Sequence, residues 1–217
     1  MRAIVVAGSP EVKRPPDLRP EPRDLIIGVD LGAAHCLRWG WRPSLVIGDL
    51  DSLPPTAQTI LADQGSPFIV MPTRKDETDL ELALNHVLQA GADPIVIVGV
   101  LGGRIDHTLA NLLLLTRADL AGRDVCMVDG RQTVRVLRPG HPLTLAGRPG
   151  DTLSLIPIGG DAAGVTAQSV EWPLTAATLP LGVARGVSNV FHGPTAALHI
   201  EHGLLLVVHI EQNELTH

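Results

Sequence analysis

The residues best suited to chemistry in this sequence are aspartates, each placed shortly after a short apolar segment. Four such segments lead into acidic side chains, and these side chains are Asp30, Asp49, Asp51, Asp76, Asp79 and Asp106. Apolar segments of this length, bounded by turn residues, are typical of strands buried on both faces of a parallel sheet. Because ligands bind beyond the carboxyl ends of such strands, we expect these carboxylates to share one edge of a sheet.

Carboxylates gathered at one edge repel one another unless a cation lies among them. Mg²⁺ prefers hard oxygen ligands and is usually held by one or two carboxylates together with substrate phosphates. The segment Gly48-Asp49-Leu50-Asp51-Ser52 is the strongest candidate, since both of its carboxylates follow a buried strand directly. Any one of the other aspartates is equally explained as a helix cap or a solvated turn residue.

A second candidate is the segment Gly102-Gly103-Arg104-Ile105-Asp106-His107. Its two glycines let the backbone approach a ligand closely, and Arg104 suits bidentate contact with phosphate. Asp106 is equally explained as the N-cap of a following helix, and His107 as an ordinary residue of a first helical turn. Lys75, beside Asp76, is either a phosphate contact or part of a solvated charged run.

The net charge is −6, and Lys13 and Lys75 are the only lysines, which argues against nucleic-acid binding through a basic surface. A protein this acidic needs a divalent cation to offset the charge of nucleotide phosphates. The sequence contains no GxxxxGK(S/T) phosphate loop, no GxGxxG fingerprint, no HExxH and no GxSxG. A nucleotide site would therefore use another architecture.

The N-terminal part alternates strand-like and helix-like segments, which predicts an α/β domain with a doubly wound, mainly parallel sheet. The expected strands are residues 3–7, 25–29, 45–47, 68–70, 95–100 and 125–128. The expected helices are residues 54–65, a helix opened by the capping box Thr78-Asp79-Leu80-Glu81 and continued through Ala90, and residues 107–121.

After about residue 131 short apolar segments recur between glycines and prolines, which predicts a small C-terminal all-β sandwich. The expected strands are residues 134–137, 143–145, 152–156, 164–166, 196–200 and 204–210. We therefore expect an α/β domain over residues 1–131 and a β-sandwich domain over residues 132–217, with a boundary somewhere near 129–138.

The cysteines and the N-terminus indicate the compartment. Cys36 and Cys126 lie far apart and lack CxxC or Cys/His spacing, so we expect buried thiols. The first apolar segment is too short for a signal peptide or a membrane span. These features predict a cytoplasmic protein without membrane association.

Four motifs occur here in the order in which they occur in thiamine pyrophosphokinases, and the chain resembles that family over nearly its whole length. The motifs are Gly28-Val29-Asp30-Leu31-Gly32-Ala33, Gly48-Asp49-Leu50-Asp51-Ser52, Lys75-Asp76-Glu77-Thr78-Asp79 and Gly102-Gly103-Arg104-Ile105-Asp106-His107. Gly186-Val187-Ser188-Asn189 resembles the family's Ser-Asn segment in its β-sandwich domain. One motif would be weak evidence, but four in order are specific.

The resemblance implies a reaction and an assembly. The implied enzyme transfers diphosphate from ATP to the hydroxyl of thiamine and releases AMP. Its implied cofactor is Mg²⁺, bound with ATP on the first domain. The implied assembly is a homodimer with active sites at the interface, where thiamine lies against the second domain of the other subunit.

The resemblance also implies roles for residues at matching motif positions. The implied metal-ligating or phosphate-site carboxylates are Asp49, Asp51 and Asp76. The further catalytic carboxylates are Asp79 and Asp106, and the ATP or phosphate contacts are Asp30, Lys75 and Arg104. The implied thiamine contacts are Ser188 and Asn189.

Two departures from the family concern a glycine and a tryptophan. The family's Asp-Gly-Gly-Ala reads Asp30-Leu31-Gly32-Ala33, in which a leucine crowds a close backbone approach unless its φ is ordinary. Some members stack a tryptophan near the C-terminus on the thiamine ring, and residues 203–207 contain no aromatic side chain. Trp172 is either its replacement or a core residue.

Other function classes stay open at this point. A diphosphokinase acting on another small alcohol, such as a hydroxymethylpterin, would keep every aspartate motif. A haloacid-dehalogenase-type phosphatase also begins with a strand followed by Asp-x-Asp, but it needs a distant lysine, and Lys75 is poorly spaced for that role. A non-catalytic nucleotide-binding regulator is a third possibility.

Overall fold

The computed structural model of the chain describes residues 1–74 and 76–212. The chain divides into two compact units, Met1–Gly130 and Arg131–His217. Within the described ranges, no helix has the length and apolar character that crossing a bilayer requires.

The first unit is built on a parallel sheet with the strand order β4-β3-β2-β1-β5-β6. Its strands are β1 (Ala3–Val6), β2 (Leu25–Val29), β3 (Leu45–Gly48), β4 (Phe68–Val70), β5 (Ile95–Val98) and β6 (Val125–Asp129). Its helices are α1 (Leu31–Arg38), α2 (Pro55–Asp63), α3 (Asp79–Gln89), α4 (Ile105–Leu114) and the 3₁₀ turn η1 (Ala118–Leu120). All six strands predicted for this part are confirmed to within two residues.

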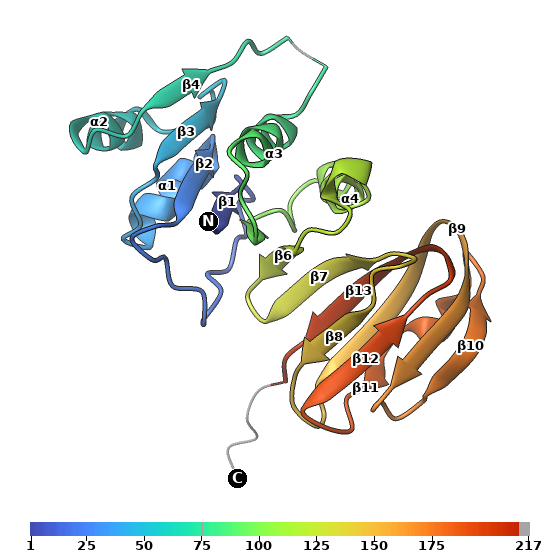
Figure 1. Cartoon of the computed structure of the whole chain (residues 1–217). Coiled ribbons are helices and arrows are strands. Elements are labelled where there is room, and N and C mark those ends of the chain that lie inside the picture. Colours follow the sequence, from blue (N-terminus) through green and yellow to red (C-terminus); the bar gives the residue numbers. More distant parts are fainter. Residues whose placement is uncertain (75, 213–217) are drawn as a thin grey trace. The chain divides into compact units, whose positions relative to one another are not determined.

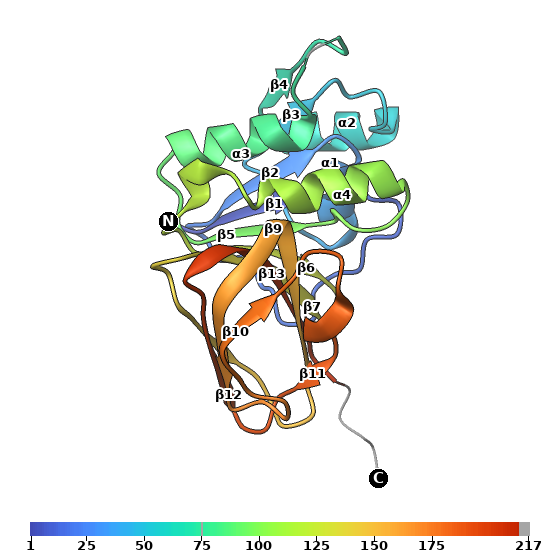
Figure 2. The ribbon, with the colours of Figure 1, turned by 90° about the vertical axis from the view of Figure 1, so that its right-hand side faces the viewer.

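Helices cover both faces of this parallel sheet. Figure 1 shows α1 and α2 on one face and α3 and α4 on the other, and Figure 2 shows α3 and α4 in front of the strands. On the α1 face, Ile4 and Ile26 pack with Cys36, and Val46 packs with Leu61 of α2. Burial on both faces explains why these strands read as continuous apolar segments in the sequence.

The helix α1 is not among the helices predicted above, because close packing rather than local pattern stabilises it. A Cβ atom at Gly32 would lie 1.8 Å from the carbonyl oxygen of Val6, and one at Gly28 would lie 2.7 Å from the Cα of Ala33. Only glycine at these positions lets the helix lie so near β1 and β2.

The capping prediction for α3 is confirmed, but the last predicted helix was too long. The Thr78 hydroxyl accepts a hydrogen bond from the Glu81 N–H (3.2 Å), and Ala90 ends α3. Residues 107–121 were predicted as one helix, whereas α4 begins at Ile105 and ends at Leu114. It ends there because Arg117 turns to an extended conformation (ψ 136°) and contacts Asn85 and Asp119.

The strand order reverses between β1 and β5, since β1 leads on to β2 on one side and β5 leads on to β6 on the other. A reversal of this kind leaves a crevice beyond the carboxyl ends of the two strands. The aspartate loops described below follow strands of this same edge.

The second unit is antiparallel, with the order β7-β13-β9-β12-β8 and with β10 and β11 also paired to β9. Its elements are β7 (Gln132–Leu137), β8 (Leu143–Ala146), β9 (Thr152–Gln168), β10 (Leu174–Leu179), the 3₁₀ turn η2 (Ala184–Gly186), β11 (Asn189–Val190), β12 (Thr195–His199) and β13 (His202–Ile210). Buried side chains including Leu153, Leu155, Phe191 and Leu205 form its core.

The strand β9 differs from the prediction because it is one long strand rather than two short ones. Its first half pairs with β13, and its second half pairs with β10 and β12. Gly159 (φ 74°) and Gly160 (φ 158°) lie between the two halves. The glycines that suggested a break in the sequence therefore lie inside a continuous strand that serves two sets of partners.

Candidate functional site at the carboxyl edge of the parallel sheet

Asp30 and Gly48 form the base of the site. Asp30 follows β2 with φ 45°, and its N–H donates to the carbonyl oxygen of Ile47 (3.1 Å). Its carboxylate accepts a hydrogen bond from the Leu50 N–H (3.1 Å). A Cβ atom on Gly48 would lie 1.7 Å from Asp30 Oδ1. The glycine that precedes Asp49 is therefore required by the carboxylate of the neighbouring strand.

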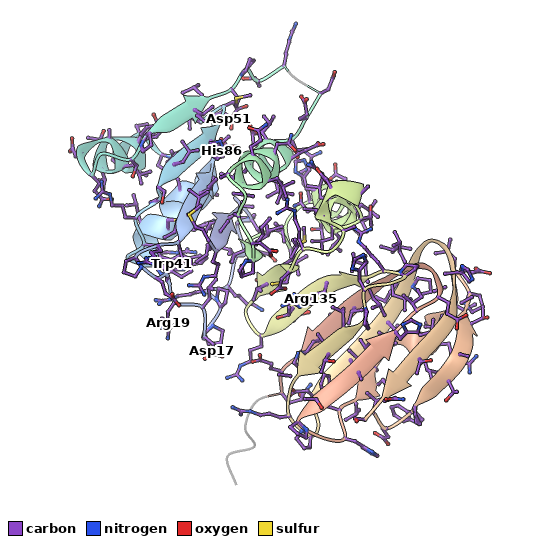
Figure 3. All side chains as sticks on the ribbon, viewed as in Figure 1. Asp17, Arg19, Trp41, Asp51, His86 and Arg135 are labelled. Carbon is purple, nitrogen blue, oxygen red and sulfur yellow. The ribbon has the colours of Figure 1, made fainter. Side chains whose placement is uncertain are left out.

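The loop after β3 is held by its own polar groups. Leu50 has φ 64°, and the Asp51 N–H donates to Asp49 Oδ1 (3.1 Å). The Ser52 hydroxyl accepts from the Leu31 N–H (3.2 Å), so this loop also satisfies the first turn of α1. Asp51, labelled in Figure 3, is the exposed carboxylate of the loop, and Asp49 is half-buried.

Three half-buried carboxylates meet at this edge. Asp30, Asp49 and Asp79 come from β2, β3 and α3, and one ligand oxygen from each lies within 4.8 Å of the others. Asp79 is the first residue of α3, where the helix dipole stabilises negative charge. Three such oxygens are suitable ligands for a hard divalent cation, and Mg²⁺ fits this donor set.

The raised pKa values of aspartates at this edge agree with a cation site. The pKa of Asp30 is raised to about 7, chiefly by burial and also by the charges of Asp79 and Asp49, against the opposing hydrogen bond from Leu50. Hydrogen bonding and charge from Asp49 raise the pKa of Asp51. A cation among these oxygens would relieve the repulsion that makes proton loss costly.

A cavity of about 620 Å³ opens beside the carboxylates. It lies at the β1/β5 reversal and is lined by Ser9, Asp30, Ser52, Asp79, Arg104 and His107, together with glycines of the loop after β5. Gly102 and Gly103 have φ of 89° and 69°, and their missing Cβ atoms would approach Glu11 and Pro10 within 3.0 and 3.3 Å. A cavity of this size can hold a nucleotide-sized ligand.

Arg104 lies at the edge of this cavity and is exposed. Its guanidinium binds Asp106 in a bidentate manner, with Nε–Oδ1 and Nη2–Oδ2 distances of 3.1 and 2.5 Å. This contact lowers the pKa of Asp106 to about 2. Arg104 occupies the N-cap position of α4 without a side-chain capping hydrogen bond, and Asp106 lies in the first turn, so the N-cap interpretation of Asp106 was wrong.

In the second unit, Ser188 is exposed to solvent whereas its neighbour Asn189 is buried. Ser188 is exposed, with φ 63°, and its N–H donates to the Ser154 hydroxyl (3.0 Å). Asn189 is 7% exposed and binds the backbone of Trp172 twice, accepting from its N–H (3.0 Å) and donating to its carbonyl oxygen (2.8 Å). Trp172 is 57% exposed, so the interpretation of this residue as a core tryptophan was wrong.

The predicted site residues thus fall into groups. Asp30, Asp49 and Asp79 are brought together, Asp51 lies beside Asp49, and the pair Arg104–Asp106 borders the same cavity through Arg104. Asp76 is exposed in the segment between β4 and α3 and is not a member of the three-carboxylate group. Lys75 lies outside the described residues. The roles assigned to these residues stay predictions.

Sequence reasoning missed two polar residues of the cavity wall, Ser9 and Asn111. The Asn111 amide donates to the carbonyl oxygen of Val100 (3.1 Å) and so holds the loop after β5. Ser9 follows β1 just as the aspartates follow the other strands. Its position after a strand could have identified Ser9, but the prediction considered only acidic side chains at such positions.

Comparisons with known proteins agree over both units. The family model for the thiamin pyrophosphokinase catalytic domain matches residues 20–127, and the model for the thiamin pyrophosphokinase vitamin B1 binding domain matches residues 141–205. Thiamine pyrophosphokinase of Bacillus subtilis is 29% identical over 206 residues, which are 94% of this chain and 96% of the relative.

Solved structures also resemble the chain over nearly its whole length. The crystal structure of thiamine pyrophosphokinase from Bacillus subtilis has a TM-score of 0.88 at 27% identity and covers 98% of this chain and 100% of its own. The structure of thiamin pyrophosphokinase from Geobacillus thermodenitrificans has a TM-score of 0.84 at 29% identity and covers 99% of each chain. The yeast enzyme, 16% identical with a TM-score of 0.69, shares the fold.

Proposed function

The chain belongs to the thiamine pyrophosphokinase family, and we propose that its aspartate-lined cavity binds ATP with Mg²⁺ for transfer of diphosphate to the thiamine hydroxyl. AMP is the second product. The observation that carries this proposal is the group of Asp30, Asp49 and Asp79 beside a cavity at the strand reversal of the matched catalytic region. Among the residues that the structure describes, carboxylates and no lysine line the cavity, which suits a metal–nucleotide complex rather than free ATP.

In this proposal Asp30, Asp49 and Asp79 hold Mg²⁺. When bound, the ion neutralises phosphate charge and orients the transferred group. The chain's own contribution is positioning: the Leu50 N–H fixes the Asp30 carboxylate, and the Asp51 N–H fixes that of Asp49. Arg104 contacts a phosphate from the edge of the cavity, and Asp106 holds its guanidinium there.

The two units are proposed to act as an α/β catalytic domain over residues 1–131 and a β-sandwich domain over residues 132–217. The division of contacts after Gly130 and the limits of the two matching family models support these bounds. The β-sandwich domain provides Ser188 and Asn189 on the thiamine side. We also propose a homodimer with active sites at the interface, as the resemblance of the sequence motifs to this family implies.

A cytoplasmic location belongs to the same proposal. Cys36 and Cys126 are both buried, and burial raises the pKa of the Cys36 thiol to about 12. A buried thiol with so high a pKa is unreactive, which suits a reducing compartment.

The alternatives left open by the sequence find no support in the comparisons. The matched second region is described as a vitamin B1 binding domain, which favours thiamine over a hydroxymethylpterin as acceptor. The matched family models and the relatives described above are those of thiamine pyrophosphokinases and not of a phosphatase or a regulator.

The test is to incubate the protein with ATP, Mg²⁺ and thiamine and to measure AMP and thiamine diphosphate. We expect both products in equal amounts. AMP only with a hydroxymethylpterin would show the other diphosphokinase, free phosphate without an acceptor would show a phosphatase, and ATP binding without turnover would show a regulator. Any of these three results would refute the proposal.

The matched variants for this assay are Asp49→Asn and Asp63→Asn. The asparagine at position 49 keeps an acceptor for the Asp51 N–H and removes the charge, so we expect a loss of at least ~100-fold in turnover, as for loss of one charged contact to a transition state. Asp63 is the exposed last residue of α2 and lies away from the cavity, so its variant keeps full turnover. Full activity in Asp49→Asn would refute the metal assignment.

A further inference from the structure

His35 is a buried titratable residue that the proposed reaction does not use. It lies on α1, is 6% exposed, and places its Nε2 atom 2.9 Å from the carbonyl oxygen of Ser9. Because a carbonyl oxygen only accepts, Nε2 must carry the hydrogen. Burial lowers the pKa of His35, so the ring is neutral near pH 7. Trp39 stacks on the ring, with centroids 6.1 Å apart, and touches Trp41, labelled in Figure 3.

Ser9 joins His35 to the cavity. Its N–H donates to the carbonyl oxygen of Gly99 (3.0 Å), and its hydroxyl donates to that of Leu101. Ser9 and Gly99 both line the cavity, whereas His35 does not. One residue therefore links α1, the loop after β1 and the loop after β5.

The two loops pack too closely to move independently. A Cβ atom on Gly99 (φ 74°) would lie 2.5 Å from the carbonyl oxygen of Ala7, and one on Gly102 would lie 3.4 Å from the Ser9 hydroxyl. A shift of Ser9 is therefore passed on to the glycines after β5. The other donor to the Ser9 carbonyl, the Val12 N–H, is 3.4 Å away, too far to replace the histidine.

We propose that His35 is a positioning residue for the nucleotide: through the Ser9 carbonyl it fixes the cavity wall made by Ser9, Pro10 and Gly99–Gly103. This inference rests on the proposed binding of Mg-ATP in that cavity. Loss of the imidazole donor leaves the Ser9 carbonyl, among the described residues, with only the long Val12 contact and releases the wall. Because the wall that His35 fixes belongs to the proposed nucleotide cavity, its effect is on affinity for Mg-ATP and not on affinity for thiamine.

The variants that separate the hydrogen bond from the side chain's bulk are His35→Gln, His35→Asn and His35→Leu. Glutamine is long enough to place an amide donor where Nε2 lies, asparagine carries the same amide one methylene too short, and leucine has none. Ser66→Ala is the matched control, because the buried Ser66 hydroxyl donates to a loop carbonyl, Pro43 (2.9 Å), at the amino ends of β3 and β4. The thermal midpoint of each variant is also measured, so that a general loss of stability is detected for the substitutions at His35 and at Ser66 alike.

Binding of Mg-ATP without acceptor is measured by titration calorimetry, and amide hydrogen exchange is followed in peptides covering 8–13 and 99–104. We expect the dissociation constant to rise about tenfold in the leucine and asparagine variants, the size of a lost buried hydrogen bond, with faster exchange in both peptides. The glutamine variant and Ser66→Ala stay within about threefold of wild type. KM for thiamine is unchanged throughout.

Three outcomes overturn the inference: wild-type affinity and exchange in His35→Leu, equal weakening in His35→Gln, or equal weakening in Ser66→Ala. If the leucine variant fails to fold, the glutamine–asparagine pair decides alone. Failure of the proposed function would give a different result: the wild-type protein would bind Mg-ATP but form no AMP with thiamine. A wild-type protein that does not bind Mg-ATP refutes both.

Discussion

Gly48→Ala tests the contact on which the carboxylate group is built. An added Cβ would lie 1.7 Å from Asp30 Oδ1, whereas ordinary contact needs about 3.5 Å. The Asp30 carboxyl must therefore move by roughly 2 Å, which breaks its hydrogen bond from the Leu50 N–H. Loss of a hydrogen bond to a charged group costs about 1.5–3 kcal/mol. Alanine at φ 151° adds about 1 kcal/mol of backbone strain.

The free energy of unfolding should thus fall by about 3 kcal/mol, which lowers the thermal midpoint by about 6–12 °C in a chain of this size. The same shift moves one of the three oxygens proposed to ligate the metal, and a misplacement of about 1 Å can cost ~100-fold in turnover. Calorimetric melting and the AMP assay measure the two effects. Gly91→Ala is the control, because Gly91 has φ 68° and no atom within 4 Å of the added Cβ. Gly91→Ala should lower the free energy of unfolding by about 1 kcal/mol and leave turnover intact.

A double-mutant cycle decides whether the steric account is correct. In an Asp30→Ala background the carboxylate is gone, so Gly48→Ala should cost only the backbone strain of about 1 kcal/mol. The strain of Asp30 itself, at φ 45°, is present in both arms and cancels. Equal destabilisation by Gly48→Ala in both backgrounds would refute the reasoning.

Two further predictions concern protonation and the second unit. In metal-free protein the pKa of Asp30, raised to about 7 from 3.8, means that the folded state keeps a proton that the unfolded state loses, so the contribution of Asp30 to the free energy of unfolding should fall as pH rises from about 4 to 7. The lowered pKa of His35 acts in the opposite direction, so the contribution of Asp30 is read as the difference between wild type and Asp30→Asn. Asp30→Asn should remove this dependence in denaturant titrations, and an unchanged pH profile in that variant would contradict it. Asn189→Ala should lower stability by about 2–4 kcal/mol, because two backbone groups of Trp172 lose their partners. It should also raise KM for thiamine but leave Mg-ATP affinity unchanged, and a wild-type KM for thiamine would sink the role assigned to Asn189.

Much of the first unit could be predicted because its determinants are local. Apolar segments bounded by turn residues identified the strands, and Thr78 identified the start of α3. By contrast, α1 depends on the Gly32–Val6 approach, which joins residues far apart in the sequence and leaves no periodic signal. The length of β9 was missed for a similar reason, since its pairing partners β10, β12 and β13 lie later in the chain.

The candidate site shows the same limit more sharply. The sequence indicates which strands end in aspartates, but it does not indicate which carboxylates turn inward. That choice depends on positive φ angles at Asp30 and Leu50, and such angles are adopted by non-glycine residues only where tertiary contacts impose them. The three oxygens that meet therefore include those of Asp30 and Asp79, which were predicted as a phosphate contact and a further catalytic carboxylate and not as metal ligands.

The local geometry of the site accommodates Leu31, which stands where the family has a glycine. Leu31 is the first residue of α1 and has ordinary helical φ, and its N–H is satisfied by the Ser52 hydroxyl. The glycine that the fold cannot replace is the next one, Gly32, where a Cβ would overlap the Val6 carbonyl. This chain therefore keeps glycine where backbone atoms meet and replaces it where a side chain has room. For that reason the leucine leaves the Asp30–Asp49–Asp79 group intact, and the loss of one family glycine does not weaken the assignment of the metal site.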